Sequence, residues 1–372
     1  MKSRLEDVAR LAKVSVSTAS RALSGRGRVS DQTRSAVLEA ARRVGYDPRP
    51  PARGQGSAGG GTGYIGILFN KRLHSLVSDA FYGHVMEGVE QECRRRGYQV
   101  FFSTISGPGD GQALVRQLSD DKKMDGLILA GNDIPVSVVS FCLERKIPVV
   151  LVDNSPGDLP VDCVSIDNIT GGHAATAFLL KHGHRSIAYL CGPFSHPSLR
   201  ERFVGYRNAL DEAGIPFDPR LVWSTEEVSL FNDEGGFQGM LRLLAGRPRP
   251  TAVFAANDFM AIGALRAAIK EGLRVPEDLS IVGFDDVDTS RLVSPPLTTV
   301  RVMKRELGAA AADRLFERIG AVTTGESLFP LRLVVYVHLV ERESVCAPAG
   351  SSKGDDGAVP SERVTRVGRT GS

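Results

Sequence analysis

The chain has 372 residues, of which 42% are hydrophobic and 24% charged, a composition typical of globular proteins and a length that allows more than one domain. No apolar run approaches the ~20 residues that span a bilayer, and the amino terminus lacks the apolar stretch of a secretion signal, so we expect a cytoplasmic protein. The five cysteines are far apart and form no CxxC pair, which argues against a disulfide framework and against a zinc site.

The formal net charge of +3 hides an uneven distribution along the chain. Residues 1–62 contain 12 Lys and Arg against 5 Asp and Glu, a net of +7, whereas the rest of the chain contains 34 against 38, a net of −4. A basic amino-terminal segment on a mildly acidic body favours contact with phosphates.

Residues 5–24, LEDVARLAKVSVSTASRALS, have the pattern of two short helices joined by a tight turn. Apolar residues spaced to pack one side of such a pair are Leu5, Val8, Ala9 and Val14. Ser15 is placed to cap the second helix, which leaves Ser17, Thr18 and Arg21 on its exposed face. A helix of this kind fits the major groove of B-DNA, where arginine recognises a guanine edge. The pattern indicates a DNA-binding helix-turn-helix, and a helical hairpin with a solvated polar face is the alternative.

A third helix is predicted from about Asp31 to Val44, and a stretch rich in breakers follows at 47–63. That stretch, DPRPPARGQGSAGGGTG, contains three prolines and six glycines, a composition that cannot bury a core. We therefore expect a small all-α head at 1–46 and a hinge or linker at 47–63.

From residue 64 on, short apolar runs alternate with longer amphipathic segments. Strands are expected at 64–69, 99–104, 126–131, 148–153, 186–192, 251–258 and 279–286, and helices near 81–96, 198–213 and 257–271. This alternation implies parallel sheets, and the number of units favours two similar Rossmann-like α/β lobes over one sheet. Ligands in such folds bind at the carboxyl ends of strands, which here would line a cleft between the lobes.

Five segments in a fixed order carry a resemblance to a known family. They are DVARLAKVSVSTASRALSG, RVSDQTRSAVLEAARRVGY, VDCVSIDNITGGHAATAFLLKHGHRSIAYLCGP, FAANDFMAIGALRAAIKEGLRVPEDLSIVGFDD and SPPLTTVR. The chain resembles the lactose/galactose repressor (LacI/GalR) family. This resemblance implies a core of periplasmic-binding-protein type at 64–345 and a homodimer on a near-palindromic DNA operator. It also implies hinge helices in the minor groove and a small-molecule effector that changes DNA affinity.

The family's major-groove readers fall on Val16, Ser17 and Arg21 of this chain. The resemblance implies that Val16 meets a thymine methyl group, although a packing role is the alternative, and that Arg21 meets a guanine or a phosphate. Ser15 and Thr18 complete the set of DNA-contacting residues that we expect in the head.

The hinge departs from the family pattern. The family usually has a leucine two positions after an Ala-Arg pair, and this leucine wedges into the central base step; here Arg53 is followed two positions later by Gln55. Glutamine is a poor wedge, so we expect a weaker hinge that bends DNA less. Arg53 is still expected to enter the minor groove.

The positions that match the family's ligand site are Asp79, Phe81, Arg202, Phe231, Asn257 and Asp285. Arginine offers a planar fork, aspartate accepts from vicinal hydroxyls, asparagine does both, and aromatic faces cover the apolar side of a sugar ring. The alternatives are that Asn257 caps a helix, that the two phenylalanines belong to the core and that Asp285 holds a loop. Asp153 and Asp167 are weaker candidates, with strand-end and helix-cap roles as alternatives.

No GxSxG, HExxH or P-loop pattern occurs, so we expect neither an enzyme nor a cofactor. His182 and His184 resemble a metal clamp, but no acidic or cysteine ligand is spaced nearby, and we expect no metal. The polar, Gly/Ser-rich tail at 346–372 is expected to be disordered. Leucine heptads that would build a tetramer are missing, which favours a dimer.

The sequence therefore predicts a ligand-responsive, nucleoid-associated transcriptional regulator, most simply a dimeric repressor of carbohydrate uptake or catabolism genes. Two alternatives stay open. One is a soluble sugar-binding protein of the transport-receptor kind, which would need an export signal and no basic head. The other is a regulator that responds to a purine or nucleoside, because related cores bind such ligands with similar side chains.

Overall fold

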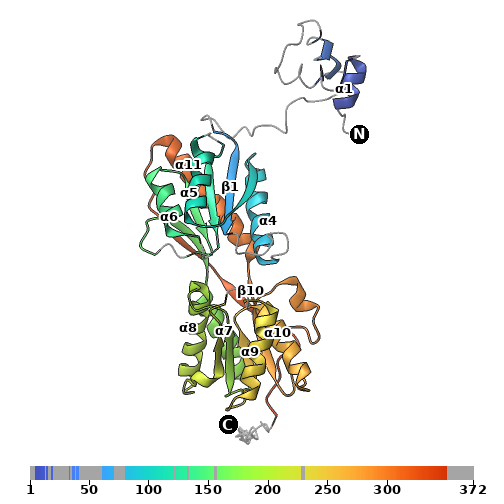
Figure 1. Ribbon diagram of the computed structural model, residues 1–372, viewed down its shortest axis with the longest axis vertical. Coiled ribbons are helices and arrows are strands. Elements are labelled where there is room, and N and C mark those ends of the chain that lie inside the picture. Colours follow the sequence, from blue (N-terminus) through green and yellow to red (C-terminus); the bar gives the residue numbers. More distant parts are fainter. Residues whose placement is uncertain are drawn as a thin grey trace, which may run out of the picture.

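The computed structural model describes residues 5–12, 14–15, 18–19, 33, 36–37, 39–41, 61–70, 80–120, 123–131, 134–154, 157–227 and 231–349. Two six-stranded sheets form the centres of two α/β lobes, which lie one above the other in Figure 1. The two lobes expected from the alternating pattern are thereby confirmed. We call the lobe that contains β1 the upper lobe and the lobe that contains β6 the lower lobe.

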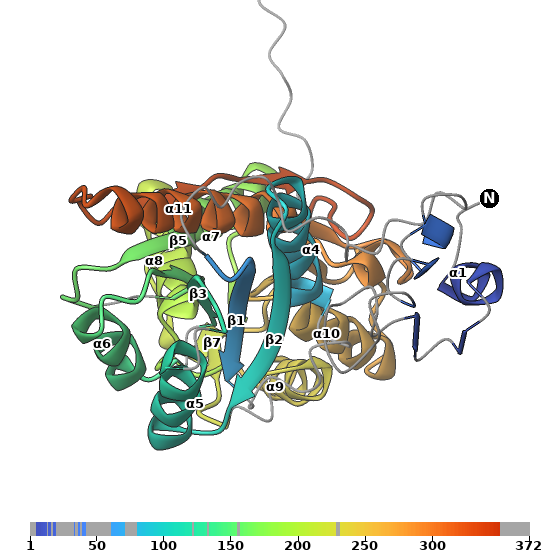
Figure 2. The same ribbon diagram turned by 90° about the horizontal axis from the view of Figure 1, so that it is seen from above.

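The upper sheet has the strand order β11-β5-β4-β3-β1-β2, and all its neighbours are parallel. Its strands are β1 (Tyr64–Asn70), β2 (Gln99–Ile105), β3 (Gly126–Ala130), β4 (Val149–Val152), β5 (Asp162–Ile166) and β11 (Arg332–Val335). Helices α4 (Ala80–Arg95) and α11 (Lys304–Thr324) cover one face, and α5 (Pro108–Asp120) and α6 (Val136–Glu144) cover the other (Figure 2). Three of these strands, β3, β4 and β5, are buried along their whole length, which explains the continuous apolar sequences of β3 and β4.

The lower sheet repeats this plan with the order β12-β10-β9-β8-β6-β7. Its strands are β6 (Ile187–Cys191), β7 (Val222–Ser224), β8 (Ala252–Ala255), β9 (Ser280–Asp285), β10 (Thr298–Val302) and β12 (Val337–Val340), of which only β12 is antiparallel to its neighbour. Helices α7 (Asn168–Lys181) and α8 (Pro197–Glu212) form one layer, and α9 (Asp233–Ala245) and α10 (Asp258–Lys270) form the other.

The described chain passes between the lobes three times, from β5 to α7, from β10 to α11 and from β11 to β12 (Figure 1). The lobes are therefore built from interleaved segments, and each crossing is a point about which they can turn. Helix α11 follows a lower-lobe strand but packs in the upper lobe against α4.

Three helix pairs touch through glycines on both partners. The pairs are Gly88 with Gly308 (α4 and α11), Gly172 with Gly205 (α7 and α8), and Gly236 with Gly263 (α9 and α10). A Cβ atom at any of these six positions would lie 2.0–2.2 Å from a backbone oxygen of the partner helix. The helices can pack this closely only without side chains there, and each pair thereby forms a rigid unit.

All seven strands predicted from the sequence are confirmed within a residue or a few at each end. Five further strands, β5, β7, β10, β11 and β12, were missed. Strand β5 lacks a continuous apolar sequence because it begins with the polar Asp162. The carboxylate of this residue is buried and pairs with Arg314 and Arg318 of α11. The continuous segment from Arg332 to Val340 looks like one strand but divides between the two sheets at Tyr336.

The head has a small apolar core of its own. Buried residues there are Val8, Ala9, Ala19, Val37, Ala40 and Ala41, with Ala12 and Val14 partly buried against them. Helix α1 spans Leu5–Leu11, and the hydroxyl oxygen of Ser15 accepts a hydrogen bond of 3.1 Å from the Thr18 N–H. The predicted packing of Val8 and Ala9 and the predicted cap at Ser15 are thus confirmed.

Candidate functional site

The candidate ligand residues of the lower lobe lie where its strands end. Asn257 follows β8, Asp285 ends β9, and Arg202 on α8 reaches both strand ends. Phe231 lies two residues before α9, and Phe81 lies on α4 of the upper lobe. Asp79 lies outside the described residues. This arrangement is the one expected for a ligand site between two parallel α/β lobes.

Arg202 is buried and each of its guanidinium nitrogens has a partner. Its Nε donates to Asn168 Oδ1 at 2.9 Å, its Nη1 donates to the Ala256 carbonyl oxygen at 2.5 Å, and its Nη2 lies 3.3 Å from Asp285 Oδ1. The guanidinium carbon also lies 3.6 Å from the centre of the Phe284 ring, a cation–π contact. Arg202 therefore links α7 to the carboxyl ends of β8 and β9, where the other candidate ligand residues lie.

Asp285 begins a backbone turn that ordinary residues rarely adopt. Its φ is 104°, and that of Asp286 is 49°, so two successive non-glycine residues lie in the left-handed region. Such strain persists only where surrounding contacts enforce it, and it is concentrated at functional sites. Asp285 thus pairs with Arg202 and begins a loop, which agrees with the structural alternative weighed for it, while its contact with a ligand stays a prediction.

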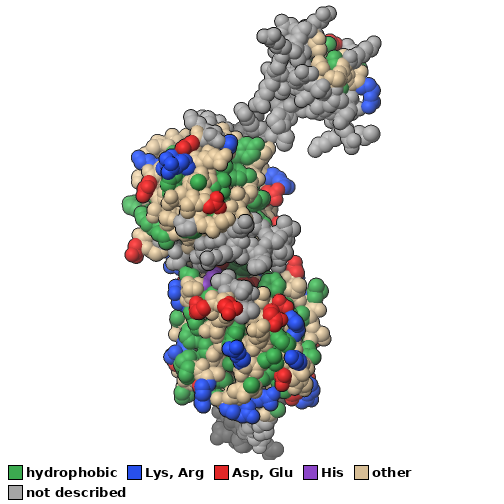
Figure 3. All heavy atoms as spheres, viewed as in Figure 1, with side chains coloured by type: hydrophobic (Ala, Val, Ile, Leu, Met, Phe, Trp, Pro, Cys, Tyr) green, Lys and Arg blue, Asp and Glu red, His purple; other side chains and the backbone are tan. Residues whose placement is uncertain are grey.

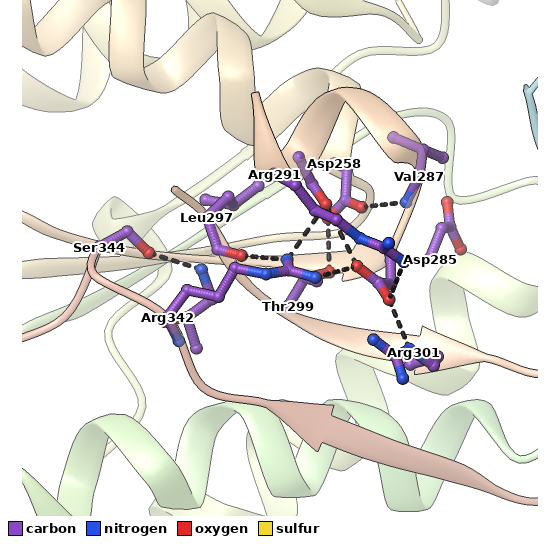
Figure 4. A network of polar contacts seen from close by, with 12 residues as sticks. Asp258, Asp285, Val287, Arg291, Leu297, Thr299, Arg301, Arg342 and Ser344 are labelled. Atoms are coloured by element: carbon purple, nitrogen blue, oxygen red, sulfur yellow. Dashed lines mark hydrogen bonds and ion pairs between the residues drawn. The ribbon is translucent and has the colours of Figure 1, made fainter. Parts of the chain in front are cut away.

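Asp258 is hydrogen-bonded to Val287, the residue that follows Asp286 in this loop. Its fully buried carboxylate accepts a hydrogen bond of 2.8 Å from the Val287 N–H and one of 2.5 Å from the Thr299 hydroxyl (Figure 4). Burial, with a smaller contribution from the charge of Asp285, raises the pKa of Asp258 to about 8. Sequence reasoning missed this residue, because a buried aspartate at the first position of a helix looks like an ordinary helix-start residue.

Asp286 anchors the loop to its own lobe through three arginines. Its carboxylate lies 2.5 Å from Arg301 Nε and from Arg342 Nη2, and 3.6 Å from Arg291 Nη2. Burial acts to raise its pKa, but the hydrogen bonds from Arg342 and Arg301 prevail and lower the pKa to about 2. Figure 4 shows these arginines converging from β10, from the segment after β12 and from the turn after β9.

The side chain of Asn257 caps α10, as the alternative weighed for it proposed. Its Oδ1 accepts a hydrogen bond of 2.8 Å from the Met260 N–H, and only its oxygen is used in that contact. The amide nitrogen is a donor that a ligand could use.

The two aromatic candidates are half-buried instead of fully enclosed in the core. The ring of Phe81 packs edge-on against Tyr82, and its centre lies 6.0 Å from Lys304 Nζ. Phe231 packs over Gly192, and the centre of its ring lies 6.1 Å from that of His196. Burial and the nearby charge of Arg202 lower the pKa of His196 to about 4, so its imidazole is neutral at physiological pH.

Asp153, a weaker candidate from the sequence, connects the two lobes. It follows β4 of the upper lobe with a φ of 49°, and its carboxylate accepts hydrogen bonds of 2.9 Å from Tyr82 and 3.1 Å from Ser198. Ser198 belongs to α8 of the lower lobe. Burial, opposed by the hydrogen bond from Tyr82, raises the pKa of Asp153 to about 6. Its strand-end position was the available sequence signal, whereas nothing in the sequence singled out Tyr82 or Ser198.

Asp167 has the structural role considered for it. Its carboxylate accepts a hydrogen bond of 3.1 Å from the Thr170 N–H and thereby caps α7. This cap lies at the first crossing between the lobes, so Asp167 fixes the start of a lower-lobe helix.

Figure 3 shows acidic side chains near the boundary between the lobes. Among the described residues, Asp153 of the upper lobe and Arg202, Asn257 and Asp285 of the lower lobe supply acceptors, donors and a fixed cation, and Phe81 and Phe231 supply aromatic surface. This combination can orient a small, hydroxyl-rich molecule between the lobes. It contains no paired nucleophile and base.

Of the candidate DNA-contacting residues, only Ser15 and Thr18 lie within the described ranges. The hydroxyl oxygens of these two residues are 2.8 Å apart. Val16, Ser17, Arg21, Arg53 and Gln55 lie outside the described residues.

Within the described ranges, no group of three or more His, Cys, Asp and Glu is placed to hold a metal ion. His182 directly follows α7 as its C-cap, with its Nδ1 2.9 Å from the Phe178 carbonyl oxygen. His184 lies 3.0 Å from the Thr251 hydroxyl and 2.8 Å from the carbonyl oxygen of Cys346. None of the helices in these ranges is long and apolar enough to cross a membrane.

Two family profiles match the chain. Residues 4–49 match the bacterial regulatory proteins of the lacI family, and residues 176–345 match a periplasmic binding protein-like domain. The first match covers the predicted helix-turn-helix, and the second covers most of the lower lobe and its connections.

Full-length relatives are similar over nearly the whole chain. The ribose operon repressor of Haemophilus influenzae is 37% identical over 317 residues, 85% of this chain and 91% of that protein. The HTH-type transcriptional repressor PurR of Pasteurella multocida is 32% identical over 347 residues, 92% of this chain and 98% of that protein.

Solved structures agree with these matches. A complex of the transcriptional regulator CelR with cellobiose has a TM-score of 0.69 at 34% identity, covering 92% of this chain and 99% of that one. The Lac repressor dimer bound to operator and the anti-inducer ONPF has a TM-score of 0.69 at 28% identity, covering 93% of this chain and 100% of that one.

Proposed function

We propose that this chain, which belongs to the LacI family of bacterial regulatory proteins and is a DNA-binding repressor, controls genes for the uptake or breakdown of a carbohydrate in response to a sugar. The sugar is the small-molecule effector, and a homodimer binds a near-palindromic operator with its two heads. The protein acts on chromosomal DNA in the cytoplasm, in association with the nucleoid, and is not an enzyme.

The observation that carries the effector class is the set of polar side chains between the lobes. Asp153 and Asp285 offer carboxylates to vicinal hydroxyls, and Arg202 and Asn257 offer donors. Half-buried phenylalanine faces on both lobes match the apolar C–H face of a sugar ring. The CelR neighbour was solved with cellobiose, and one relative is a ribose operon repressor, which supports the same class.

A purine or nucleoside effector is the second candidate, and the similarity to PurR favours it. The chemistry separates a sugar from a free purine base, because a planar base needs an aromatic face and few hydroxyl acceptors. Both carboxylates of this site are instead suited to a polyol. A nucleoside shares vicinal ribose hydroxyls with a sugar, so experiment has to separate those two.

The first experiment is a thermal-shift panel with D-ribose, cellobiose, adenosine and hypoxanthine. At a concentration a hundred times its Kd, a ligand of the folded state adds about 2.7 kcal/mol, which raises Tm by roughly 5–10 °C for lobes of this size. Phe81→Ala is expected to abolish the shift, and Phe329→Ala, which removes an 87% exposed ring in the segment before β11, serves as the matched control. A shift with hypoxanthine but with neither sugar would refute the carbohydrate proposal.

The DNA-binding proposal places Val16, Ser17, Thr18 and Arg21 in the major groove, with Ser15 as the cap that starts their helix, and Arg53 and Gln55 at the minor groove. Selection of genomic fragments on the purified protein is expected to return one short palindrome upstream of transporter or hydrolase genes. Arg21→Ala is expected to weaken binding to that palindrome by about 1–3 kcal/mol and binding to scrambled DNA much less. An equal loss on both DNAs would reassign Arg21 to the phosphate backbone.

The domain limits remain part of this proposal, with a head at 1–46, a hinge at 47–63, a core at 64–345 and a tail from 346. A transport receptor would share the core, and the binding assay distinguishes it. Such a protein would be stabilised by a sugar in the thermal-shift assay but would bind no specific DNA sequence.

A further inference from the structure

Lys304 lies where the loop that carries Asp285 meets the upper lobe. It is the first residue of α11, is 7% exposed and belongs to the helix that enters the upper lobe directly after β10. Its Nζ donates hydrogen bonds to the carbonyl oxygens of Asp285 and Asp286, the latter at 3.1 Å. The ammonium group of Lys304 is therefore hydrogen-bonded directly to the backbone of the loop that carries Asp285.

The same loop is fixed to the lower lobe from the other side. Asp258 binds the Val287 N–H, and Asp286 is held by Arg301 and Arg342 (Figure 4). The loop therefore follows the lower lobe, and the contact of Lys304 with its two carbonyls transmits any displacement of the loop to α11.

A displacement of α11 also displaces α4. Gly88 of α4 and Gly308 of α11 leave no space between the two helices, so α4 and α11 move together. Helix α4 carries Phe81 and Tyr82, and the hydroxyl of Tyr82 donates to Asp153 on the opposite wall of the site. One route between the two sides of the site thus runs through Lys304, beside the contacts of Asp153 with Ser198 and of His84 with Asp288.

We propose that Lys304 is a positioning residue that couples occupancy of the site at Asp285 to the arrangement of the two lobes, and through it to DNA affinity. The inference deepens the function proposed above and rests on it for the last of these links. In this proposal the ammonium acts through the loop, because two of its three N–H donors go to backbone carbonyls there.

The first test needs no effector. Spin labels at Phe102→Cys in β2 and Ile269→Cys in α10, both at exposed positions, report the distance between the lobes in a Cys346→Ser background. The labelled chain is diluted with unlabelled chain so that only distances within one chain are measured. Lys304→Met is expected to shift and broaden the distance distribution, because the methionine keeps the length and removes the donor.

Arg305→Met is the matched control. Arg305 is the next residue of α11, and its Nε lies 2.8 Å from Glu87 of α4, so its contact stays within the upper lobe. The control is expected to reproduce the parent distribution. If Lys304→Met also reproduces it, the proposal is overturned. If Lys304→Met does not fold, Lys304→Gln, whose shorter side chain cannot reach both carbonyls, replaces it with the same expectation.

The second test measures the coupling itself with D-ribose as the probe and the selected palindrome as the DNA. In the parent, D-ribose is expected to change operator affinity by about 5- to 150-fold. In Lys304→Met this factor is expected to fall to about one while the Kd for D-ribose stays within about threefold of the parent. A variant with a lower Tm but an unchanged coupling factor would show a merely structural lysine and overturn the proposal.

The two proposals fail in different ways. If D-ribose does not bind the parent, ribose is excluded as the effector, and the interlobe distances still decide whether Lys304 links the lobes. If D-ribose binds and Lys304→Met leaves both the distances and the coupling unchanged, the effector proposal stands and the role of Lys304 is refuted.

Discussion

Replacing Arg202 with methionine should cost a large part of the stability of the lower lobe. The change removes the donors to Asn168 and Ala256, the ion pair with Asp285 and the contact with Phe284, while it preserves most of the side-chain length. Removing one partner of a buried ion pair costs about 3–5 kcal/mol, because the other charge stays buried without compensation. That is a substantial fraction of the roughly 5–15 kcal/mol by which domains are stable.

Urea unfolding measures this loss. The chain has a single tryptophan, Trp223 in β7, so its fluorescence reports on the lower lobe. With a denaturant dependence of about 3 kcal/mol per M, the midpoint should fall by roughly 1–1.7 M. Arg200→Met is the control, because Arg200 lies on the same helix and is exposed.

A double-mutant cycle identifies the cause of the loss. Asp285→Asn removes the charge that Arg202→Met leaves unpaired, so the two changes together should cost less than their sum, by about 0.5–3 kcal/mol. If the free energy of unfolding of Arg202→Met is less than about 1 kcal/mol below that of Arg200→Met, the reasoning is refuted. Arg202 would then serve a ligand alone.

Three further predictions concern the helix contacts, the buried carboxylate and the head. Gly88→Ala should destabilise by about 1–3 kcal/mol because its Cβ would meet a backbone oxygen of α11, whereas Gly83→Ala on the same helix, with open space around it, should be neutral or stabilising by up to about 1 kcal/mol; equal thermal-denaturation results for both would contradict this. The pKa of Asp258 is raised from 3.8 to about 8, so its contribution to stability is full below about pH 4 and is lost as pH rises to about 8. Between about pH 6.5 and 8, the free energy of unfolding of the parent should therefore fall with pH more steeply than that of Asp258→Asn, by up to about 1.4 kcal/mol per pH unit. Parallel plots of the urea-derived unfolding free energy against pH would contradict the raised pKa of Asp258. Ser15→Ala should remove the cap on the Thr18 N–H and cost about 1 kcal/mol, seen as roughly fivefold faster hydrogen exchange of that amide; unchanged exchange would contradict the cap.

The sequence was sufficient where one kind of side chain dominates a segment. Strands buried on both faces are continuous apolar runs, so β3, β4 and β8 were recognisable without a structure. The Ser15 cap was predictable as well, because its partner is three residues away and capping depends on local geometry.

The sequence failed where polar residues are buried by partners from far along the chain. Asp162 interrupts β5 and finds its arginines on α11, 152 and 156 residues away. Asp258 was overlooked for the same reason, since Thr299 becomes its neighbour only when β10 pairs with β9.

The sequence by itself determined a basic helical head, two α/β lobes with strand ends facing a common site, and the residue types at that site. Only the tertiary structure decided that Arg202 is buried and bonded to neighbouring elements of its lobe, and that Asp153 accepts a hydrogen bond from a serine of the opposite lobe. It also decided that Lys304 is hydrogen-bonded to the loop at Asp285. Periodicity and capping depend on neighbours within a few residues, so a sequence records them. The charge, burial and partner of a side chain between two lobes depend on three chain crossings that bring distant segments together.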